Sequence, residues 1–403
     1  MISFFLASAL VGAVGDVSSM QSDHIAFQDN AATLSGSVHV EHPLGTLQAE
    51  KMTLQHQTRR ILMDGGVFIA LKQGGEVRAK QADVDYEKKE AVFTGDVFFT
   101  RPLNGRTITA RTETATVAFA SDNTVSLLTI PSTLSITIPE VLQLHSASAA
   151  YNTMPVSAAT LKEVTGTIAK DPEHPIAFKA ATATWQGNTL YLSGDMEFSN
   201  EEFGTLTSDG TALFAFDSGD GGLHLHGITL EKRTTYHYID PRTAGERYLV
   251  NEGIVYLDNT AHTLTISAPP GEQVYYRDHI GELYADIITV AYSAEDMRPE
   301  AITIQDNITF LNRVGEEVFQ YGLADKVVID PKTQTVVMSA PARGRVLFVD
   351  NLNKIRMSAP ALALRHDNGS TSVKGVGSVR FSFLEQELEQ IKQHFGNIAD
   401  WKE

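Results

Sequence analysis

Two histidines stand at a spacing that suits metal binding. His224-Leu-His226 puts two imidazoles on one face of an expected strand, as metal-binding β-proteins do for two ligands of one ion. A third ligand is needed, and no fixed spacing selects among His237, Asp217 and Asp220. Solvated strand histidines are the simpler interpretation. We therefore predict no metal and no other cofactor.

An acidic pair and a glycine-rich stretch are the other candidates for chemistry. Asp83-Val-Asp85 places two carboxylates on one face, but the turn Glu87-Lys-Lys-Glu90 follows and favours a solvated surface. Gly375-Val-Gly377 begins like a dinucleotide loop, yet Arg380 stands where the third glycine belongs and the stretch opens a strand. The chain has no cysteine, no nucleophile elbow and no phosphate loop. We predict that it is not an enzyme.

The composition restricts the partners. The 403 residues are 42% apolar and 20% charged, which is typical of a folded globular chain. The net charge of −17 argues against sequence-independent nucleic-acid binding, which needs Lys and Arg to displace counterions from phosphates. The basic residues that cluster modestly, and that could meet lipid phosphates, are Arg59, Arg60, Lys72, Arg78 and Lys80.

Two short phrases alternate along the chain with a period of about 30 residues. The first is an apolar residue followed two positions later by Ala, as in Leu47-Gln-Ala49, Val77-Arg-Ala79, Ile108-Thr-Ala110, His145-Ser-Ala147, Phe178-Lys-Ala180, Leu283-Tyr-Ala285 and, with a longer gap, Ile355 to Ala359. The second is Gly, any residue, then an apolar residue, at Gly36-Ser-Val38, Gly65-Gly-Val67, Gly95-Asp-Val97, Gly166-Thr-Ile168, Gly194-Asp-Met196, Gly344-Arg-Val346 and Gly377-Ser-Val379. Turn signals separate the phrases, so each period predicts two long strands with a bend or bulge at the glycine.

The two ends of the chain differ from the repeat, and helix signals are almost absent until the C-terminal end. Residues 1–15 are apolar and end in small residues, which is typical of a signal peptide, although no basic residue precedes them. Residues 383–395 place Leu384, Leu388, Ile391 and Phe395 at helical spacing, which predicts one amphipathic helix that caps the last strand.

The alternating phrases resemble the lipopolysaccharide-transport protein A family, also called OstA-like, over about residues 24–382. The resemblance implies an open β-jelly-roll, periplasmic location in a Gram-negative bacterium, end-to-end strand pairing with other lipopolysaccharide-transport proteins or with itself, and a groove for the acyl chains of lipopolysaccharide or lipooligosaccharide. This chain is longer than one usual family module. We therefore expect an elongated, all-β, V-shaped stack of antiparallel strands, with residues 1–22 a signal-like segment, 23–214 and 215–383 two jelly-roll regions, and 384–403 the helix.

The groove is predicted from the resemblance and the alternation together. The expected inner-wall residues are Val38, Val40, Val67, Ile69, Val97, Phe99, Ile168, Met196, Phe198, Val346, Phe348, Val379 and Phe381. The same residues would form the core of a closed sandwich. A structural β-repeat protein with a filled core, which binds protein partners through its strand edges, is therefore the alternative function. A carbohydrate-active β-solenoid enzyme is a third possibility, but no catalytic residues stand out from the repeat.

Overall fold

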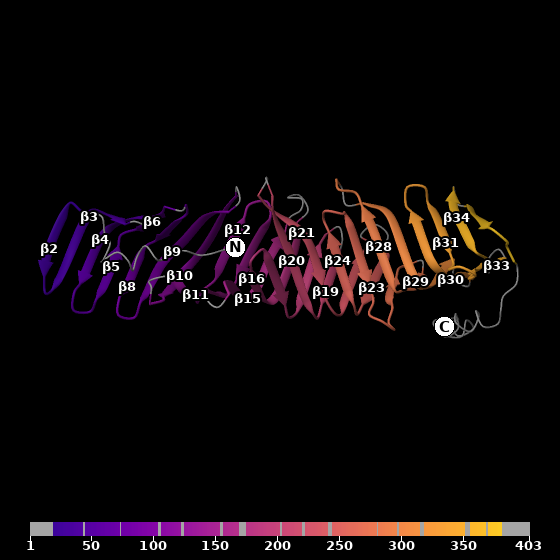
Figure 1. Ribbon diagram of the computed structural model, residues 1–403, viewed down its shortest axis with the longest axis horizontal. Coiled ribbons are helices and arrows are strands. Elements are labelled where there is room, and N and C mark those ends of the chain that lie inside the picture. The colour runs from indigo at the N-terminus through magenta and orange to yellow at the C-terminus, as the bar shows by residue number, and fades with distance from the viewer. Residues whose placement is uncertain are drawn as a thin grey trace. The chain divides into compact units, whose positions relative to one another are not determined.

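The computed structural model describes residues 19–380 apart from short gaps at 43–44, 73, 104–105, 122–124, 154–155, 169–174, 202–203, 220–221, 241–243, 280, 296–297, 315–317, 351–354 and 368–369. The described residues form strands and turns without a helix, and the strands pair antiparallel (Figure 1). The prediction of an all-β antiparallel fold is confirmed. The predicted C-terminal helix and most of the signal-like segment lie outside the described residues, while Ser19–Gln21, at the end of that segment, forms a strand.

The chain divides into two compact units, residues 1–200 with 213–225, and residues 201–212 with 226–403. Whether each is a separate family module stays a prediction. The strands of the first unit are β1 (Ser19–Gln21), β2 (His24–Gln28), β3 (Ala31–His42), β4 (Gly45–Gln55), β5 (Arg60–Asp64), β6 (Val67–Leu71), β7 (Glu76–Ala79), β8 (Gln81–Asp85), β9 (Glu90–Leu103), β10 (Arg106–Phe119), β11 (Val125–Ile130), β12 (Leu134–Ile138), β13 (Leu142–Ser146), β14 (Ser148–Asn152), β15 (Ala158–Ile168), β16 (Ile176–Gln186), β17 (Thr189–Ser193) and β18 (Met196–Asn200).

Two strands, β20 (Thr211–Gly219) and β21 (Gly222–Leu230), contribute residues to both units. The strands of the second unit are β19 (Gly204–Ser208), β22 (Thr234–Ile239), β23 (Glu246–Asn251), β24 (Ile254–Asp258), β25 (Thr263–Ser267), β26 (Val274–Arg277), β27 (Gly281–Ala285), β28 (Ile287–Tyr292), β29 (Pro299–Val314), β30 (Val318–Asp330), β31 (Thr335–Ser339), β32 (Val346–Asp350), β33 (Ile355–Ala359), β34 (Ala361–Asp367) and β35 (Ser370–Val376).

In the first unit the long strands each belong to two half-sheets, which we call the first and second walls. Strand β4, for example, pairs with β5 through Lys51–Gln55 and with β6 through Gly45–Gln48. The long strands β3, β4, β9, β10, β15 and β16 contribute one half to each wall. The short strands of the first wall are β2, β5, β8, β11, β14, β17 and β20. Those of the second wall are β1, β6, β7, β12, β13 and β18. In the second unit β29 and β30 likewise each pair with one short strand through one half and with another short strand through the other half.

A bulge with left-handed backbone lies where β3 and β9 pass from one wall to the other. In β3, Gly36 and Ser37 both have positive φ and together lie opposite a single residue of β4, between the pairs Ser35–Lys51 and Val38–Ala49. Strand β9 repeats this at Gly95 and Asp96. Two residues opposite one bend a strand sharply, and glycine adopts the left-handed region without steric cost. The predicted bend at the glycine phrase is therefore present in these strands.

The two sequence phrases meet across neighbouring strands of the second wall. Val38 pairs with Ala49, Val67 with Ala79 and, in the second unit, Val346 with Ala359. The valine two residues after the glycine thus lies beside the alanine of the other phrase. A small side chain leaves room for the β-branched side chain beside it on the neighbouring strand. This explains why the two phrases alternate in the sequence.

Some copies of the glycine phrase do not form the bend. In β15 the left-handed residue is Glu163, and Gly166 lies in regular strand, where an added Cβ would be 2.4 Å from the carbonyl oxygen of Gln143. In β29 the bend is made by Asp306 and Asn307 without any glycine. Asp and Asn tolerate left-handed backbone better than most residues do, so the bend survives there.

The bends give a test of the fold. A Cβ at Gly194 would lie 2.8 Å from the Cβ of Ala181, whereas one at Gly66 meets nothing within 4 Å, and both glycines have positive φ. We expect Gly66→Ala to cost about 1 kcal/mol, from backbone strain alone. Gly194→Ala should cost at least about 1 kcal/mol more in urea unfolding because it overpacks the bend.

Adding Ala181→Gly to Gly194→Ala should remove the second part of this loss but not the first. Equal losses in Gly66→Ala and Gly194→Ala would show that the close approach at the bend is not a constraint.

Candidate functional site

A cavity of about 990 Å³ lies between the two walls at the end of the first unit formed by β1 and β2. This volume is at the upper end of the range for small-molecule sites. Its apolar lining includes Ala31, Ala32, Met52, Leu54, Ile61 and Met63 of the first wall and Met20, Val40, Leu47 and Ile69 of the second. The side chains of both walls therefore surround one apolar space.

Strand register explains why these residues line one space. In the first wall Leu54 pairs with both Ala32 and Ile61, and in the second wall Leu47 pairs with both Val40 and Ile69. Residues directly opposite on neighbouring strands point to the same face of a sheet. Each wall thus offers a continuous row of apolar side chains.

The cavity ends at an exposed strand. All five residues of β2 are exposed, and in the register of β2 with β3 Phe27 pairs with Ala32 while Ile25 pairs with Leu34. Phe27, which lines the cavity, is 82% exposed and Ile25 is 59% exposed. These two side chains lie on the apolar face of the first wall, so that face continues to the edge of the unit without a cover among the described residues.

Polar side chains border the cavity at the turns of the first wall. His56 and Arg59 are exposed in the turn between β4 and β5, and Arg60 follows at the start of β5. The Arg60 Nε donates to the Asp83 Oδ1 at 3.2 Å, and this hydrogen bond and the charge of Asp83 raise the pKa of Arg60. Burial raises the pKa of Tyr86 to about 12, so this cavity residue stays neutral at physiological pH.

The thirteen predicted groove residues do not share one environment. Val40 and Ile69 line the cavity. Val379 is partly buried and lies outside the strands, and Phe381 is outside the described residues. The others are buried between strands, and their contact with a lipid stays a prediction; they are Val38, Val67, Val97, Phe99, Ile168, Met196, Phe198, Val346 and Phe348.

Farther along the first unit the walls touch each other. Phe214 of the first wall lies 6.1 Å from Phe178 and 5.9 Å from Phe198, both of the second wall, measured between ring centroids. Phe214 is fully buried. Aromatic rings at these distances are in packing contact. The interior is therefore filled here, in contrast to the cavity at β1 and β2.

The residues that the sequence analysis missed belong to the first wall. The prediction took apolar residues after each glycine and so found only the second wall. The residues two positions before the same glycines are Leu34, Met63, Phe93 and Leu192, and all four are buried. Apolar residues alternate with polar ones both before and after each glycine. This pattern predicts that a bent strand contributes apolar side chains to both walls.

The histidine cluster does not assemble into a metal site in the part of the chain that the structure describes. His224 is exposed on β21, and the Nδ1 of His226 lies 3.2 Å from the Thr260 hydroxyl. His237, on β22, lies with its Nε2 3.0 Å from the Glu246 Oε1. Asp217 is exposed on β20, and Asp220 is outside the described residues.

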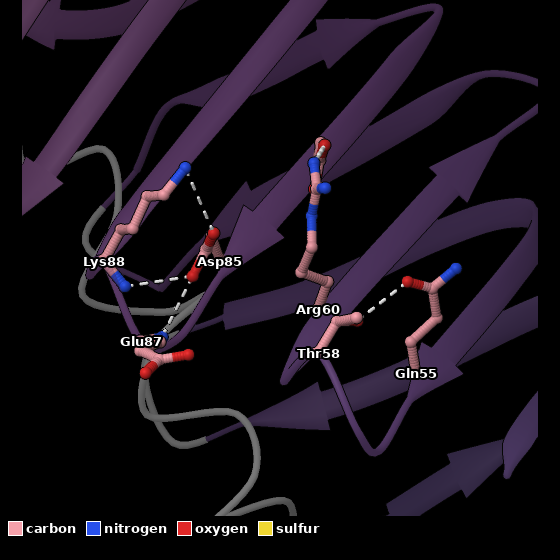
Figure 2. A network of polar contacts seen from close by, with 7 residues as sticks. Gln55, Thr58, Arg60, Asp85, Glu87 and Lys88 are labelled. Carbon is pink, nitrogen blue, oxygen red and sulfur yellow. Dashed lines mark hydrogen bonds and ion pairs between the residues drawn. The ribbon is translucent and has the colours of Figure 1, made fainter.

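The acidic pair serves structural contacts. Asp83 pairs with Arg60, and Asp85 closes the turn between β8 and β9 by accepting from the backbone N–H groups of Glu87 and Lys88 (Figure 2). The Lys88 N–H is the main cause of the lowered pKa of Asp85. Asp83 and Asp85 are thus engaged in an ion pair and in turn hydrogen bonds.

The same turn recurs in the second unit. Asp258 accepts from the N–H groups of Thr260 and Ala261, and Asp330 accepts from those of Lys332 and Thr333. The Ala261 N–H is the main cause of the lowered pKa of Asp258, whereas the lowered pKa of Asp330 comes first from the Thr333 side chain and then from the Thr333 N–H. In the turn between β4 and β5 the position is Gln55, whose Oε1 accepts from the Thr58 hydroxyl instead (Figure 2).

Comparison with known proteins leaves the family of this chain open. No family model matches the sequence, and no curated protein does. Among solved structures, the chain is similar to LptH, the LptA homologous periplasmic component of the lipopolysaccharide transport device of Pseudomonas aeruginosa, with 15% identity over 25% of this chain and 73% of that one. The TM-score is 0.22, too low to carry an argument about function. In the described residues no helix is long and apolar enough to cross a bilayer.

The turn aspartates give a prediction for pH. Their folded pKa values lie below the usual value, so they add stability above the unfolded pKa of about 3.9 and lose it as pH falls through the folded value. Asp85→Asn, Asp258→Asn and Asp330→Asn should each lower the melting temperature at neutral pH. Each should also reduce the loss of stability between about pH 5 and pH 2, measured by urea unfolding.

The control for charge alone is Glu201→Gln, at an exposed turn position. If it changed the acid limb of the stability curve as much as the aspartate variants do, the turn hydrogen bonds would not be the cause.

Proposed function

We propose that this protein is a non-enzymatic lipid carrier whose interior shelters the acyl chains of lipopolysaccharide or lipooligosaccharide as they cross the periplasm. The observation that carries the proposal is the apolar cavity between the walls, which reaches the exposed Phe27 at the edge of the unit. The alternating sequence phrases, which resemble the lipopolysaccharide-transport protein A family, support the choice of ligand and of compartment.

The chemistry of the cavity suits a hydrocarbon chain. Aliphatic and methionine side chains line the cavity from both walls, and burial of a methylene contributes roughly 0.8 kcal/mol without any directed polar contact. A chain of about ten buried methylenes would thus gain up to about 8 kcal/mol before the cost of association. Met52 and Met63, which face each other across β4 and β5, can adapt to chains of different shape.

The rim of the cavity suits a phosphate-bearing head group. Arg59 is exposed at the turn that borders the cavity, and Arg60 begins the next strand. Of the other basic residues in this cluster, Arg78 is paired with Glu76 and Lys80 with Asp96, while Lys72 is exposed. Arg60 is itself paired with Asp83. In a chain with a net charge of −17, an anionic lipid is therefore best accepted where Arg59 meets the apolar lining.

Movement of lipid beyond the cavity requires the walls to separate. The contacts of Phe214 with Phe178 and Phe198 fill the interior of the same unit. We infer that the cavity is the resting binding site, and that transfer along the unit opens the packed interior step by step.

Free strand edges support end-to-end assembly. Among the residues that the structure describes, β2 pairs with β3 on one side only and β35 pairs with β34; all five residues of β2 are exposed. An edge with unpaired N–H and C=O groups accepts another strand. We propose that these edges join further copies or other lipopolysaccharide-transport proteins.

The alternative is a structural repeat protein that binds proteins through its edges and holds no lipid. The aromatic contact around Phe214 and the burial of Val97 and Met196 favour it, because a filled core would look like this. The two functions differ in what occupies the cavity, so a probe placed in the lining distinguishes them.

Photo-crosslinking from the cavity lining is the test. A photoreactive amino acid in place of Ile69 or Met63 should crosslink to lipopolysaccharide when the protein is expressed in a host that makes this lipid. Detection uses mass spectrometry of the purified full chain. The matched control is Phe214, which is fully buried where the walls are in contact and should give little or no crosslink in the resting protein.

Native mass spectrometry of the same preparation should show bound lipid, and Ala32→Trp, which fills the cavity from the first wall, should remove most of it. A lipid-free mass together with silent probes at Ile69 and Met63 would favour the structural repeat protein.

A further inference from the structure

Two arginines lie on the inner face of the second wall. Arg101 is on β9, where it follows Val97 and Phe99 at intervals of two residues. Arg106 is on β10, two residues before Ile108. Val97, Phe99 and Ile108 are all buried. Because side chains two residues apart in a strand share a face, both arginines belong to the face that the wall turns inward.

The two arginines are close neighbours in the sheet. Arg101 pairs with Ile108 in the antiparallel register of β9 and β10, and Arg106 lies two residues from Ile108 on the same strand. Diagonal neighbours of this kind are roughly 7–8 Å apart, a distance that long side chains can cross. The two guanidinium groups can therefore reach one small ligand from two strands.

Both guanidinium groups have a buried nitrogen atom without a hydrogen bond. The Nη1 of Arg101 and the Nε of Arg106 are shielded from solvent, and neither bonds to a described residue. The Nη1 of Arg106 is held, because it donates to the Pro139 carbonyl oxygen at 2.7 Å and to the Glu140 Oε2 at 2.9 Å. Burial of a charged donor without an acceptor is unfavourable. Two such donors on one face indicate an anionic ligand.

Glycine leaves space between the cavity and Arg101. A Cβ added to Gly75 would lie 3.5 Å from the Arg101 Cα and 2.6 Å from the Thr100 carbonyl oxygen. The Leu71 N–H donates to the Gly75 carbonyl oxygen at 3.0 Å, and Leu71 pairs with Gly45, which lines the cavity. Leu71 thus supplies the one side chain between Gly45 and Arg101 in this row, which spans three strand spacings or roughly 14 Å.

We propose that Arg101 and Arg106 form a binding site for a phosphate group. A guanidinium group can donate two parallel hydrogen bonds to phosphate oxygens, and such charge-assisted bonds are stronger than those between neutral groups. One phosphate has enough oxygens to accept from both arginines. The phosphate is either free or carried by an amphiphile whose hydrocarbon chain lies in the cavity, and only the second case rests on the proposed function.

The site is separate from the other basic residues of the first unit. Arg59 borders the cavity from a turn of the first wall. Arg78 and Arg111 belong to the second wall but lie on its outer face and are exposed. Their guanidinium carbons lie 5.5 Å from the ring centroid of Phe68 and 4.7 Å from that of Phe98, respectively. These two arginines therefore provide a matched control for charge on the same strands and their neighbours.

Calorimetric titration of the full-length protein tests the proposal, with inorganic phosphate and with dodecyl phosphate below the concentration at which it forms micelles. The double variant Arg101→Gln with Arg106→Gln should bind dodecyl phosphate at least about tenfold more weakly than the wild type, because it loses charge-assisted hydrogen bonds. The double variant Arg78→Gln with Arg111→Gln changes the net charge equally and should keep the wild-type affinity.

The two ligands distinguish the sources of the phosphate. Binding of inorganic phosphate that depends on Arg101 and Arg106 would show a site for the free ion. Binding of dodecyl phosphate alone, with the same dependence, would show that the phosphate arrives on an amphiphile. Equal affinities in the two double variants, or no binding of either ligand to the wild type, would overturn the proposal.

Failure of this proposal and failure of the proposed function give different results. Crosslinks from Ile69 and Met63 to lipopolysaccharide, together with equal affinities in the two double variants, would retain the lipid carrier and remove the phosphate site. Silent probes at Ile69 and Met63, together with inorganic phosphate bound through Arg101 and Arg106, would do the reverse.

Thermal unfolding gives a second measurement. Arg101→Met replaces a charged side chain that has an unbonded buried nitrogen with an apolar one, so it should raise the melting temperature of the ligand-free protein. It should also abolish the rise in melting temperature that inorganic phosphate or dodecyl phosphate causes in the wild type. An Arg101→Met protein that melts below the wild type and still responds to both ligands as the wild type does would overturn the proposal.

Discussion

The passage of each long strand from one wall to the other is the constraint on which the structure depends. At Gly36–Ser37 and at Gly95–Asp96, two left-handed residues lie opposite one residue of the partner strand. Without this bulge a strand of twelve to fourteen residues would run straight and its two halves would form a single flat layer. With it, the apolar positions on both sides of the bend point into the same interior. The cavity, the packed aromatic contact and the alternating sequence phrases all follow from this one backbone device.

What fills the interior then depends on side-chain volume. Around Phe214 three aromatic rings from the two walls meet. Around Met52 and Met63 the lining is aliphatic, and a space of about 990 Å³ remains. Aromatic side chains reach farther across such a gap than aliphatic ones do. One repeat can therefore serve as a closed core in one place and as a binding cavity in another, and burial of the predicted groove residues alone does not distinguish the two.

The fold class could be predicted because it depends on patterns of residues that are close together in the sequence. The alternation of apolar and polar residues predicts the strands, and the glycine phrases predict the bends at Gly36, Gly65, Gly95 and Gly194, where φ is positive. The bend at Asp306–Asn307 could not be found in this way, because those residue types are also common in turns. The first wall was missed because only residues after each glycine were considered. The cavity itself depends on how two walls from distant sequence approach each other, which no local pattern encodes.

Apolar surface is treated differently at two places in the chain, and this difference bears on function. Ile25 and Phe27 of β2 are exposed on the apolar face of their wall, next to a strand edge and a cavity. Leu347 and Val349 of β32 are as apolar but almost fully buried, on the face of the strand opposite to Phe348. Leaving a large aromatic side chain such as Phe27 in water forfeits roughly 1.5–3 kcal/mol relative to burying it. An exposed apolar surface of this size is typical of a place that contacts a ligand or a partner, and the end of the first unit has such a surface. Apolar surface without such a role is usually buried.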